Sequence, residues 1–156
     1  MSRRNGHPSS RPNGAVDILL VEDNAADAEL TREALTSTDD GTSLHVVRDG
    51  VEALAFLRRL PPHESAPRPA LILLDLNLPW MDGRAVLTEI KRDPALRGIP
   101  VVVLTSSAAE RDVLGAYELN ANCYVTKPLN LDDFLGVVRA VREFWVTTAV
   151  LPPSAA

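Results

Sequence analysis

Five side chains that could bind a metal ion or a phosphoryl group stand at the ends of short apolar runs in this sequence. In chain order they are Glu22, Asp23, Asp75, Thr105 and Lys127. Three carboxylates cannot all stay ionised at close range without a counterion. A hard divalent cation with oxygen ligands meets this need, and Mg²⁺ suits an open site that keeps some waters. An ammonium and a hydroxyl group beside such a site would hold the oxygens of a phosphoryl group.

This combination of groups indicates phosphoryl transfer onto a carboxylate. A carboxylate beside a metal ion can act as the nucleophile and form an acyl phosphate, and Asp75 is the candidate acceptor. Each residue alone also has an ordinary structural role, because acidic pairs after strands often cap helices and a Lys-Pro pair often lies in a loop. The chain has only two lysines, Lys91 and Lys127. Because lysine is this rare in the chain, Lys127 at a strand end is less easily explained as a surface group that only improves solubility.

The apolar runs that carry these groups predict the strands of a parallel sheet. Residues 18–21, 71–74 and 101–104 are continuously apolar, as in strands that are buried on both faces. Residues 44–47 and 123–125 are weaker runs that suit the edges of the sheet. Helical patterns fill the remaining chain at 25–36, 51–60, 84–92, 108–119 and 131–146. Five strand–helix units predict one doubly wound α/β domain with ligands at the carboxyl ends of its strands.

The composition fits one globular domain and excludes several classes of function. Of the 156 residues, 1–15 have the composition of a disordered leader and 148–156 that of a short C-terminal tail. Residues 16–156 carry a net charge of −8, a poor match for nucleic acid or anionic lipid. The single cysteine, Cys123, cannot form an internal disulfide, and no apolar stretch approaches the ~20 residues of a membrane span. We therefore expect a cytoplasmic protein with no nucleic-acid or membrane partner.

Several motifs, in register with one another, give the chain a family resemblance. They are ILLVED at 18–23, LILLDLNLPWMDG at 71–83, VVVLTSS at 101–107 and YVTKPL at 124–129. Thr105 lies 30 residues after Asp75, and Lys127 lies 52 residues after it. With these motifs and spacings the chain resembles, over residues 16–147, a receiver domain of the bacterial two-component response regulators. The resemblance implies the flavodoxin-like fold with five parallel strands in the order 2-1-3-4-5.

The resemblance also implies a role for each matching residue. Asp75 would be the phosphoacceptor, Lys127 would pair with the phosphoryl group, and Thr105 would donate a hydrogen bond to it. Mg²⁺ would be bound directly by Asp23, Asp75 and the backbone carbonyl of Asn77, and by Glu22 through a water. Tyr124 matches the aromatic residue whose rotamer follows that threonine. In this family the peptide bond between the lysine and the proline, here Lys127 and Pro128, is typically cis.

Two further segments narrow the resemblance. The proline-rich stretch at 61–69 and the ending EFWVTTAVLP at 143–152 resemble the small receivers paired with bacterial and cyanobacterial phytochrome kinases. The implied function is that of a stand-alone response regulator in a phosphorelay, phosphorylated by a sensor histidine kinase, with a bacteriophytochrome as the candidate kinase. About 25 residues at most lie outside the domain, too few for a DNA-binding or catalytic effector, so the signal would pass through protein–protein contacts.

The last predicted helix carries more apolar residues than one packed face requires. One stripe at spacings of three and four comprises Leu131, Phe134, Val138, Val141 and Trp145, and a second comprises Val137, Ala140 and Phe144. The surplus suggests a partner surface, for which a homodimer through this helix is the simplest hypothesis. The alternative interpretation is that Phe144 and Trp145 merely close the end of the core.

Two competing functions fit the site less well. A Mg²⁺-dependent phosphohydrolase with an aspartyl nucleophile would place a second acid two residues after the nucleophile, where this chain has Asn77. A degenerate receiver that binds partners without phosphate would not need Asp75, Thr105 and Lys127 together. We therefore expect a signalling protein that catalyses only its own phosphorylation and dephosphorylation, rather than an enzyme with an external substrate.

Overall fold

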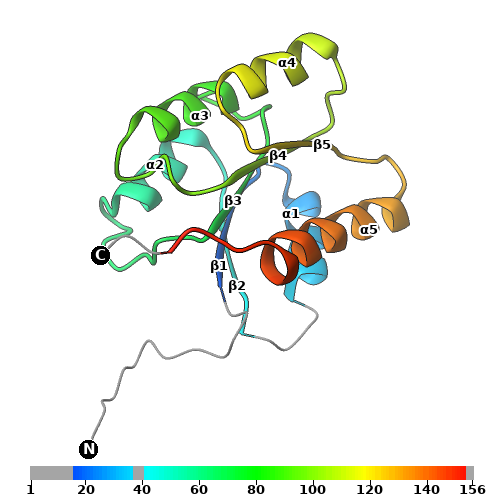
Figure 1. Ribbon diagram of the computed structural model, residues 1–156, viewed down its shortest axis with the longest axis horizontal. Coiled ribbons are helices and arrows are strands. Elements are labelled where there is room, and N and C mark those ends of the chain that lie inside the picture. Colours follow the sequence, from blue (N-terminus) through cyan, green and yellow to red (C-terminus); the bar gives the residue numbers. More distant parts are fainter. Residues whose placement is uncertain (1–15, 37–40, 154–156) are drawn as a thin grey trace, which may run out of the picture.

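A computed structural model of the chain describes residues 16–36 and 41–153, and it contains one parallel sheet between two layers of helices (Figure 1). The strands have the spatial order β2-β1-β3-β4-β5, which confirms the predicted doubly wound architecture. The strands are β1 (Asp17–Val21), β2 (Ser43–Val47), β3 (Leu71–Leu74), β4 (Val101–Thr105) and β5 (Cys123–Thr126). The helices are α1 (Ala25–Thr36), α2 (Gly50–Arg58), α3 (Gly83–Arg92), α4 (Glu110–Glu118) and α5 (Leu131–Arg142), followed by a π-helical segment η1 (Glu143–Thr148).

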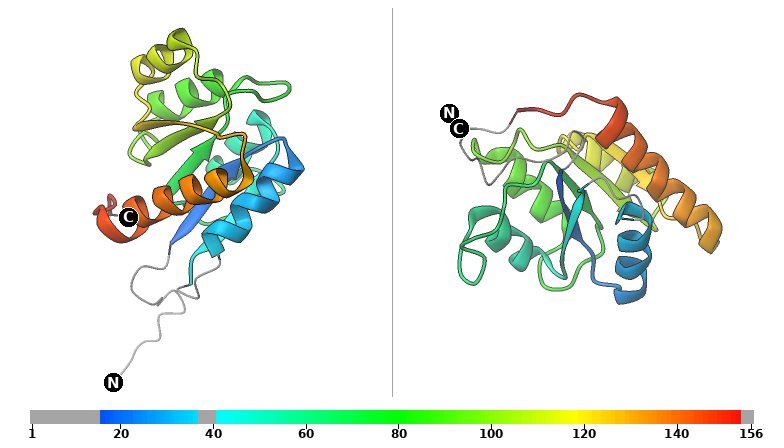
Figure 2. Two further views of the ribbon diagram at one scale, coloured as in Figure 1. Left: turned by 90° about the vertical axis from the view of Figure 1, so that its right-hand side faces the viewer. Right: turned by 90° about the horizontal axis from the view of Figure 1, so that it is seen from below.

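The sheet is buried on both faces because the helices divide between them. Helices α1 and α5 lie side by side on one face, whereas α2, α3 and α4 cover the other (Figures 1 and 2). Side chains alternate along each strand, so Ile18 and Leu20 join the core under α1 and α5, while Leu19 and Val21 join the core under α2 and α3. This two-sided burial explains why the central strands are continuously apolar in sequence.

Side-chain caps fix where several helices begin. The carboxylate of Asp49 accepts a hydrogen bond from the backbone N–H of Glu52 at 2.8 Å and starts α2. Asn130 caps α5 in the same way, through the N–H of Asp133 at 3.1 Å. Such caps satisfy backbone donors that have no partner inside the helix.

The end of the last helix differs from the prediction. A single helix was expected over residues 131–146, but α5 ends at Arg142 and the chain continues as the wider η1 segment. Within this segment Trp145 packs against the core under α1 and α5, whereas Phe144 has 52% of its surface exposed. Trp145 therefore belongs to the core, as the alternative interpretation held, and Phe144 remains available to a partner.

Two other expectations concern the leader at residues 1–15 and the peptide bond between Lys127 and Pro128. The expected leader, residues 1–15, lies outside the described residues. The cis peptide bond found in the described ranges joins Pro61 and Pro62, so the bond between Lys127 and Pro128 is trans and the expectation of a cis bond there is wrong. Across 16–36 and 41–153, no helix combines the length and the apolar character needed to cross a membrane.

Candidate functional site

The carboxyl ends of β1, β3 and β5 meet at the side chain of Lys127. Its Nζ lies 2.5 Å from Oε1 of Glu22, 3.1 Å from Oδ2 of Asp75 and 3.0 Å from Oδ2 of Asp27. Only 8% of the lysine side chain is exposed. One buried ammonium thus contacts three carboxylates and offsets part of their negative charge.

The backbone of the parallel sheet places these groups. The N–H of Asp75 donates to the carbonyl of Val21 at 3.1 Å, which continues the pairing of β1 and β3 by one residue. The N–H of Lys127 donates to the carbonyl of Thr105 at 2.7 Å and extends the pairing of β4 and β5 in the same way. The side chains that follow these strands therefore leave the sheet at one edge, as expected for ligand sites in this architecture.

Burial and charge have opposite effects on the pKa values of Glu22 and Lys127. Burial raises the pKa of the Glu22 carboxyl to about 7, although the ammonium of Lys127 and the N–H of Asn24 both lower it. Burial alone would lower the pKa of Lys127, but the carboxylates of Glu22, Asp75 and Asp27 raise it above its ordinary value. The lysine consequently stays charged at every physiological pH.

Asp75 is held in a defined orientation. Its Oδ1 accepts a hydrogen bond from the N–H of Asn77 at 3.1 Å, and its Oδ2 contacts Lys127. The following loop returns so closely that a Cβ at Gly83 would collide with the carbonyl oxygen of Asp75 and with the backbone of Leu76. Only glycine fits at residue 83, and the start of α3 therefore fixes the backbone of the candidate acceptor.

Thr105 is fully buried at the end of β4. Its hydroxyl is one of the few buried side-chain polar atoms in the described chain that have no hydrogen-bond partner. A buried hydroxyl without a partner costs free energy. The position is therefore suited to an incoming acceptor such as a phosphoryl oxygen.

Tyr124 connects the loop that follows Thr105 to β5. Its hydroxyl donates to the carbonyl of Ser107 at 2.7 Å, and its ring packs beside the core under α2 and α3. The hydroxyl of Ser107 donates to Asp112 at 2.5 Å, and Asp112 is also paired with Arg84 at the start of α3. The loop between β4 and α4 is thus tied to both neighbouring helices.

The structure brings together Glu22, Asp75 and Lys127, as the sequence predicted, but it places Asp23 differently. Asp23 is exposed and makes no hydrogen bond or ion pair within the described residues. In those same residues no three acidic, histidine or cysteine side chains are grouped as metal ligands. The carboxylates of Glu22, Asp27 and Asp75 face the ammonium of Lys127 instead.

Sequence reasoning missed Asp27. This residue lies in the first turn of α1, where an acidic side chain is ordinarily explained by the helix dipole. The contact with Lys127 spans 100 residues of sequence and could not be read from local spacing.

Comparisons with known proteins agree with this geometry. A sequence profile described as "Response regulator receiver domain" matches residues 18–139. Response regulator Rcp1 of Synechocystis sp. is 52% identical over 135 residues, which cover 86% of this chain and 92% of Rcp1.

Two solved structures extend the likeness to three dimensions. The crystal structure of the phosphorylated cyanobacterial phytochrome response regulator RcpA is 50% identical, with a TM-score of 0.87 over 89% of this chain and 99% of RcpA. The structure of the Mn²⁺-bound form of Rcp1 is 51% identical, with a TM-score of 0.85 over 88% of this chain and 99% of Rcp1. The profile match and these identities show that the chain belongs to the response regulator receiver domain family.

Proposed function

We propose that this response regulator is phosphorylated on Asp75 by a sensor histidine kinase. One observation carries the proposal: Oδ2 of Asp75 lies 3.1 Å from the buried ammonium of Lys127, beside a strand end where the Thr105 hydroxyl is buried without a partner. An acceptor carboxylate, a fixed cation and an unused donor are the parts that a phosphoryl group requires. Phosphate uptake by the wild-type chain and by Asp75→Asn tests the proposal.

The chemical step is a transfer between two protein side chains. An Asp75 carboxylate oxygen attacks the phosphorus of a phosphohistidine, the P–N bond breaks, and the imidazole leaves with its electron pair. The product is an aspartyl phosphate whose oxygens can accept hydrogen bonds from Lys127 and Thr105. The hydrolase alternative has no support here, since Asn77 cannot act as an acid or a base.

A divalent cation, Mg²⁺ in the cell, completes the proposed site. Asp23, Asp75 and the backbone carbonyl of Asn77 would bind it, and Glu22 would act through a water. The donor set fits, because all of these ligands are hard oxygens and the Asp23 carboxylate is exposed with no competing partner in the described chain. When bound, the cation neutralises charge on the phosphoryl oxygens. The Mn²⁺ in the Rcp1 structure supports this assignment.

Replacing Asp23 by alanine should weaken Mg²⁺ binding at least tenfold, which corresponds to about 1.4 kcal/mol. The variant removes a proposed ligand without opening the core, because the side chain is exposed. Trp80 is 88% exposed in the loop after Asp75, so its fluorescence should follow a Mg²⁺ titration.

Asp27→Asn is the matched control for that titration. It removes one negative charge from the same segment and one contact of Lys127, but no proposed metal ligand. We expect its Mg²⁺ affinity to stay within a few-fold of the wild-type value. Equal losses in Asp23→Ala and Asp27→Asn would contradict the ligand assignment and leave only a general effect of charge.

The proposed partner is a kinase of the phytochrome class. The similarity to a cyanobacterial phytochrome response regulator supports this choice, as does the proline-rich segment at 61–69. The net charge of −5 argues against nucleic-acid and membrane partners, and we propose that the protein acts in the cytoplasm. It would signal by contacts and not by turnover of an external substrate.

Tyr124 is the proposed switch that carries the signal to the surface. A phosphoryl group that draws Thr105 toward Asp75 would move the loop holding the carbonyl of Ser107, to which the Tyr124 hydroxyl donates. The ring would follow, and the surface formed by α4 and β5 would repack. Such a response needs an element with two arrangements that the phosphoryl group biases.

Self-association through the last helix should weaken when Phe144 is replaced by alanine. We propose a homodimer, the commonest closed assembly, strengthened by the phosphoryl mimic beryllofluoride. Phe144 is exposed, so the variant should stay folded while its dimer dissociation constant rises about tenfold or more. Sedimentation velocity with and without beryllofluoride measures the change.

Val51→Ala is the control for the dimer experiment, because Val51 is a 59% exposed apolar residue on α2, across the sheet. It should leave the association unchanged. A monomer at tens of micromolar, with and without beryllofluoride, would contradict the homodimer and leave a different protein as the receiver of the signal.

A further inference from the structure

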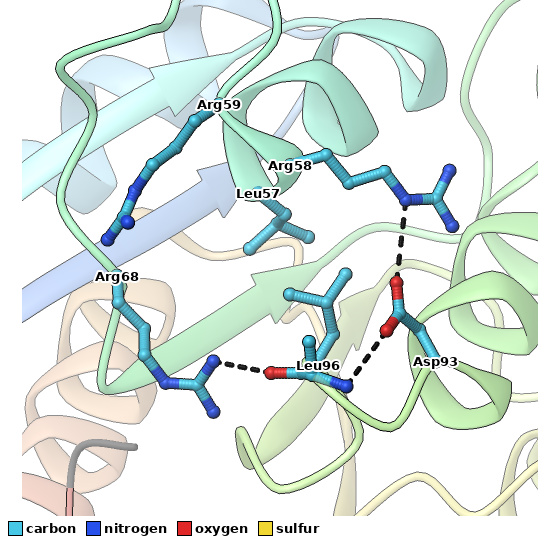
Figure 3. Close-up of a pocket in the computed structure, with 7 residues that line it drawn as sticks. Leu57, Arg58, Arg59, Arg68, Asp93 and Leu96 are labelled. Carbon is cyan, nitrogen blue, oxygen red and sulfur yellow. Dashed lines mark hydrogen bonds and ion pairs between the residues drawn. The ribbon is translucent and has the colours of Figure 1, made fainter. Parts of the chain in front are cut away.

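Three arginines surround a hollow of about 480 Å³ at the end of the sheet opposite to Asp75. It lies between the last turns of α2 and α3, beside the residues that lead into β3 and β4 (Figure 3). Its lining consists of Leu57, Arg58, Arg59, Arg68, Asp93, Ala95 and Leu96. The volume falls within the range of ordinary small-molecule sites, roughly 300–1,000 Å³.

Two of the three guanidinium groups carry uncompensated charge. Nε of Arg59 donates to the carbonyl of Ala66 at 2.9 Å, and Nη1 of Arg68 donates to the carbonyl of Ala95 at 2.5 Å. Each guanidinium is therefore held by a main-chain oxygen and keeps its other N–H donors. Neither forms an ion pair with a carboxylate in the described ranges.

The third arginine is already neutralised. Arg58 lies 3.3 Å from Glu89 and 3.6 Å from Asp93. In Figure 3, Arg58 and Asp93 lie on one side of the hollow and Arg59 and Arg68 lie on the other. Leu57 and Leu96 lie between the two sides. The hollow thus has a positive side, formed by Arg59 and Arg68, and a side where Arg58 is paired with Asp93.

The backbone at Arg59 gives an independent reason to assign a role to its side chain. The residue ends α2 with φ 55° and ψ 41°, in the left-handed region, which glycine adopts most easily. Its N–H and that of Leu60 close the helix by donating to carbonyls of the last turn. The helix end needs only the backbone, so the arginine occupies a position where glycine would be more stable.

We propose that this hollow binds a phosphate group, free or carried by a small organic molecule, which Arg59 and Arg68 hold above the largely buried side chains of Leu57 and Leu96. Guanidinium groups match phosphate oxygens in geometry and charge. The site is separate from Asp75, and its occupancy does not depend on the proposed phosphorylation.

The test is an amide NMR titration of the full chain with adenosine monophosphate, inorganic phosphate and adenosine, in buffer with EDTA so that no metal recruits phosphate to Asp75. We expect millimolar or tighter binding of the two phosphates, with shifts at residues that line the hollow, and no binding of adenosine. Tighter binding of adenosine monophosphate than of phosphate would identify an organic ligand, and equal binding would identify the free anion. Both results support the site.

Arg59→Gly separates binding from folding. It should weaken adenosine monophosphate binding at least tenfold. The melting temperature should change little, because glycine suits the left-handed backbone and this gain offsets the lost hydrogen bond from Nε to the carbonyl of Ala66. Arg68→Gln should weaken binding similarly. Arg92→Gln, which removes a 69% exposed arginine of α3 from outside the hollow, should bind as the wild type does. Unchanged binding in Arg59→Gly, equal binding of adenosine, or no shifts with either phosphate would overturn the proposal.

Discussion

Replacing Asp75 by asparagine should abolish phosphate uptake from acetyl phosphate or from a cognate kinase in the presence of Mg²⁺. The amide has the shape of the carboxylate but is not a nucleophile for this reaction. Its oxygen can still accept the hydrogen bond from the N–H of Asn77, so the fold should persist. The wild-type chain should take up one phosphate that is labile to both acid and alkali, measured by intact mass.

Asp27→Asn is a demanding control for this result. Like Asp75→Asn it removes a carboxylate that contacts Nζ of Lys127, so the two variants lose the same charge and the same kind of ion pair. We expect Asp27→Asn to retain phosphate uptake. Uptake that persists in Asp75→Asn, or that is lost equally in both variants, would contradict the assignment of Asp75 as the acceptor.

Replacing Lys127 by methionine should lower the free energy of unfolding by about 3–5 kcal/mol in metal-free buffer. The ammonium is buried and contacts three carboxylates. Removing it leaves those charges close together without a cation, and each repels the others. Urea denaturation at neutral pH measures the loss, and added Mg²⁺ should restore part of it by binding the folded form.

Lys91→Met is the matched control, since Lys91 is the only other lysine of the chain. Its Nζ donates to the carbonyls of Arg97 and Ile99 and to Oδ1 of Asn122, all of them uncharged acceptors. Its replacement should cost less, about 1–3 kcal/mol, and should not respond to Mg²⁺. Equal losses in the two variants, both insensitive to Mg²⁺, would contradict the view that Lys127 neutralises the site.

The architecture could be predicted because a parallel sheet that is buried on both faces requires continuously apolar strands, and such runs can be recognised in the sequence. The runs at 18–21, 71–74 and 101–104 lie within the three central strands. The limits of α5 were harder to predict, because residues 143–146 continue the apolar spacing of a helix. Periodicity does not distinguish an α-helical from a π-helical continuation, and in the structure Trp145 of η1 packs against the core under α1 and α5.

The site was predictable to the extent that strand ends fix side chains. Glu22 and Asp75 follow directly on neighbouring strands, so parallel pairing places them side by side. Lys127 follows β5, which does not pair with β1 or β3, and its long side chain reaches them across the edge of the sheet. Asp23 lies one residue after Glu22, in the turn before α1. No strand pairing fixes the direction of its side chain there. Asp27 reaches the lysine from a helix, and that contact depends on the packing of α1 against the sheet edge.

Reduction of the phosphorylated protein with borohydride, followed by peptide mass spectrometry, tests the central claim most directly. An aspartyl phosphate is reduced to homoserine, so the modified position identifies the acceptor without any substitution. The account predicts homoserine at residue 75, dependent on Mg²⁺ and on the phosphodonor, with Asp23 and Asp27 unmodified. Homoserine at residue 23 or 27, or phosphate found stably on Thr105 or Ser107, would contradict it.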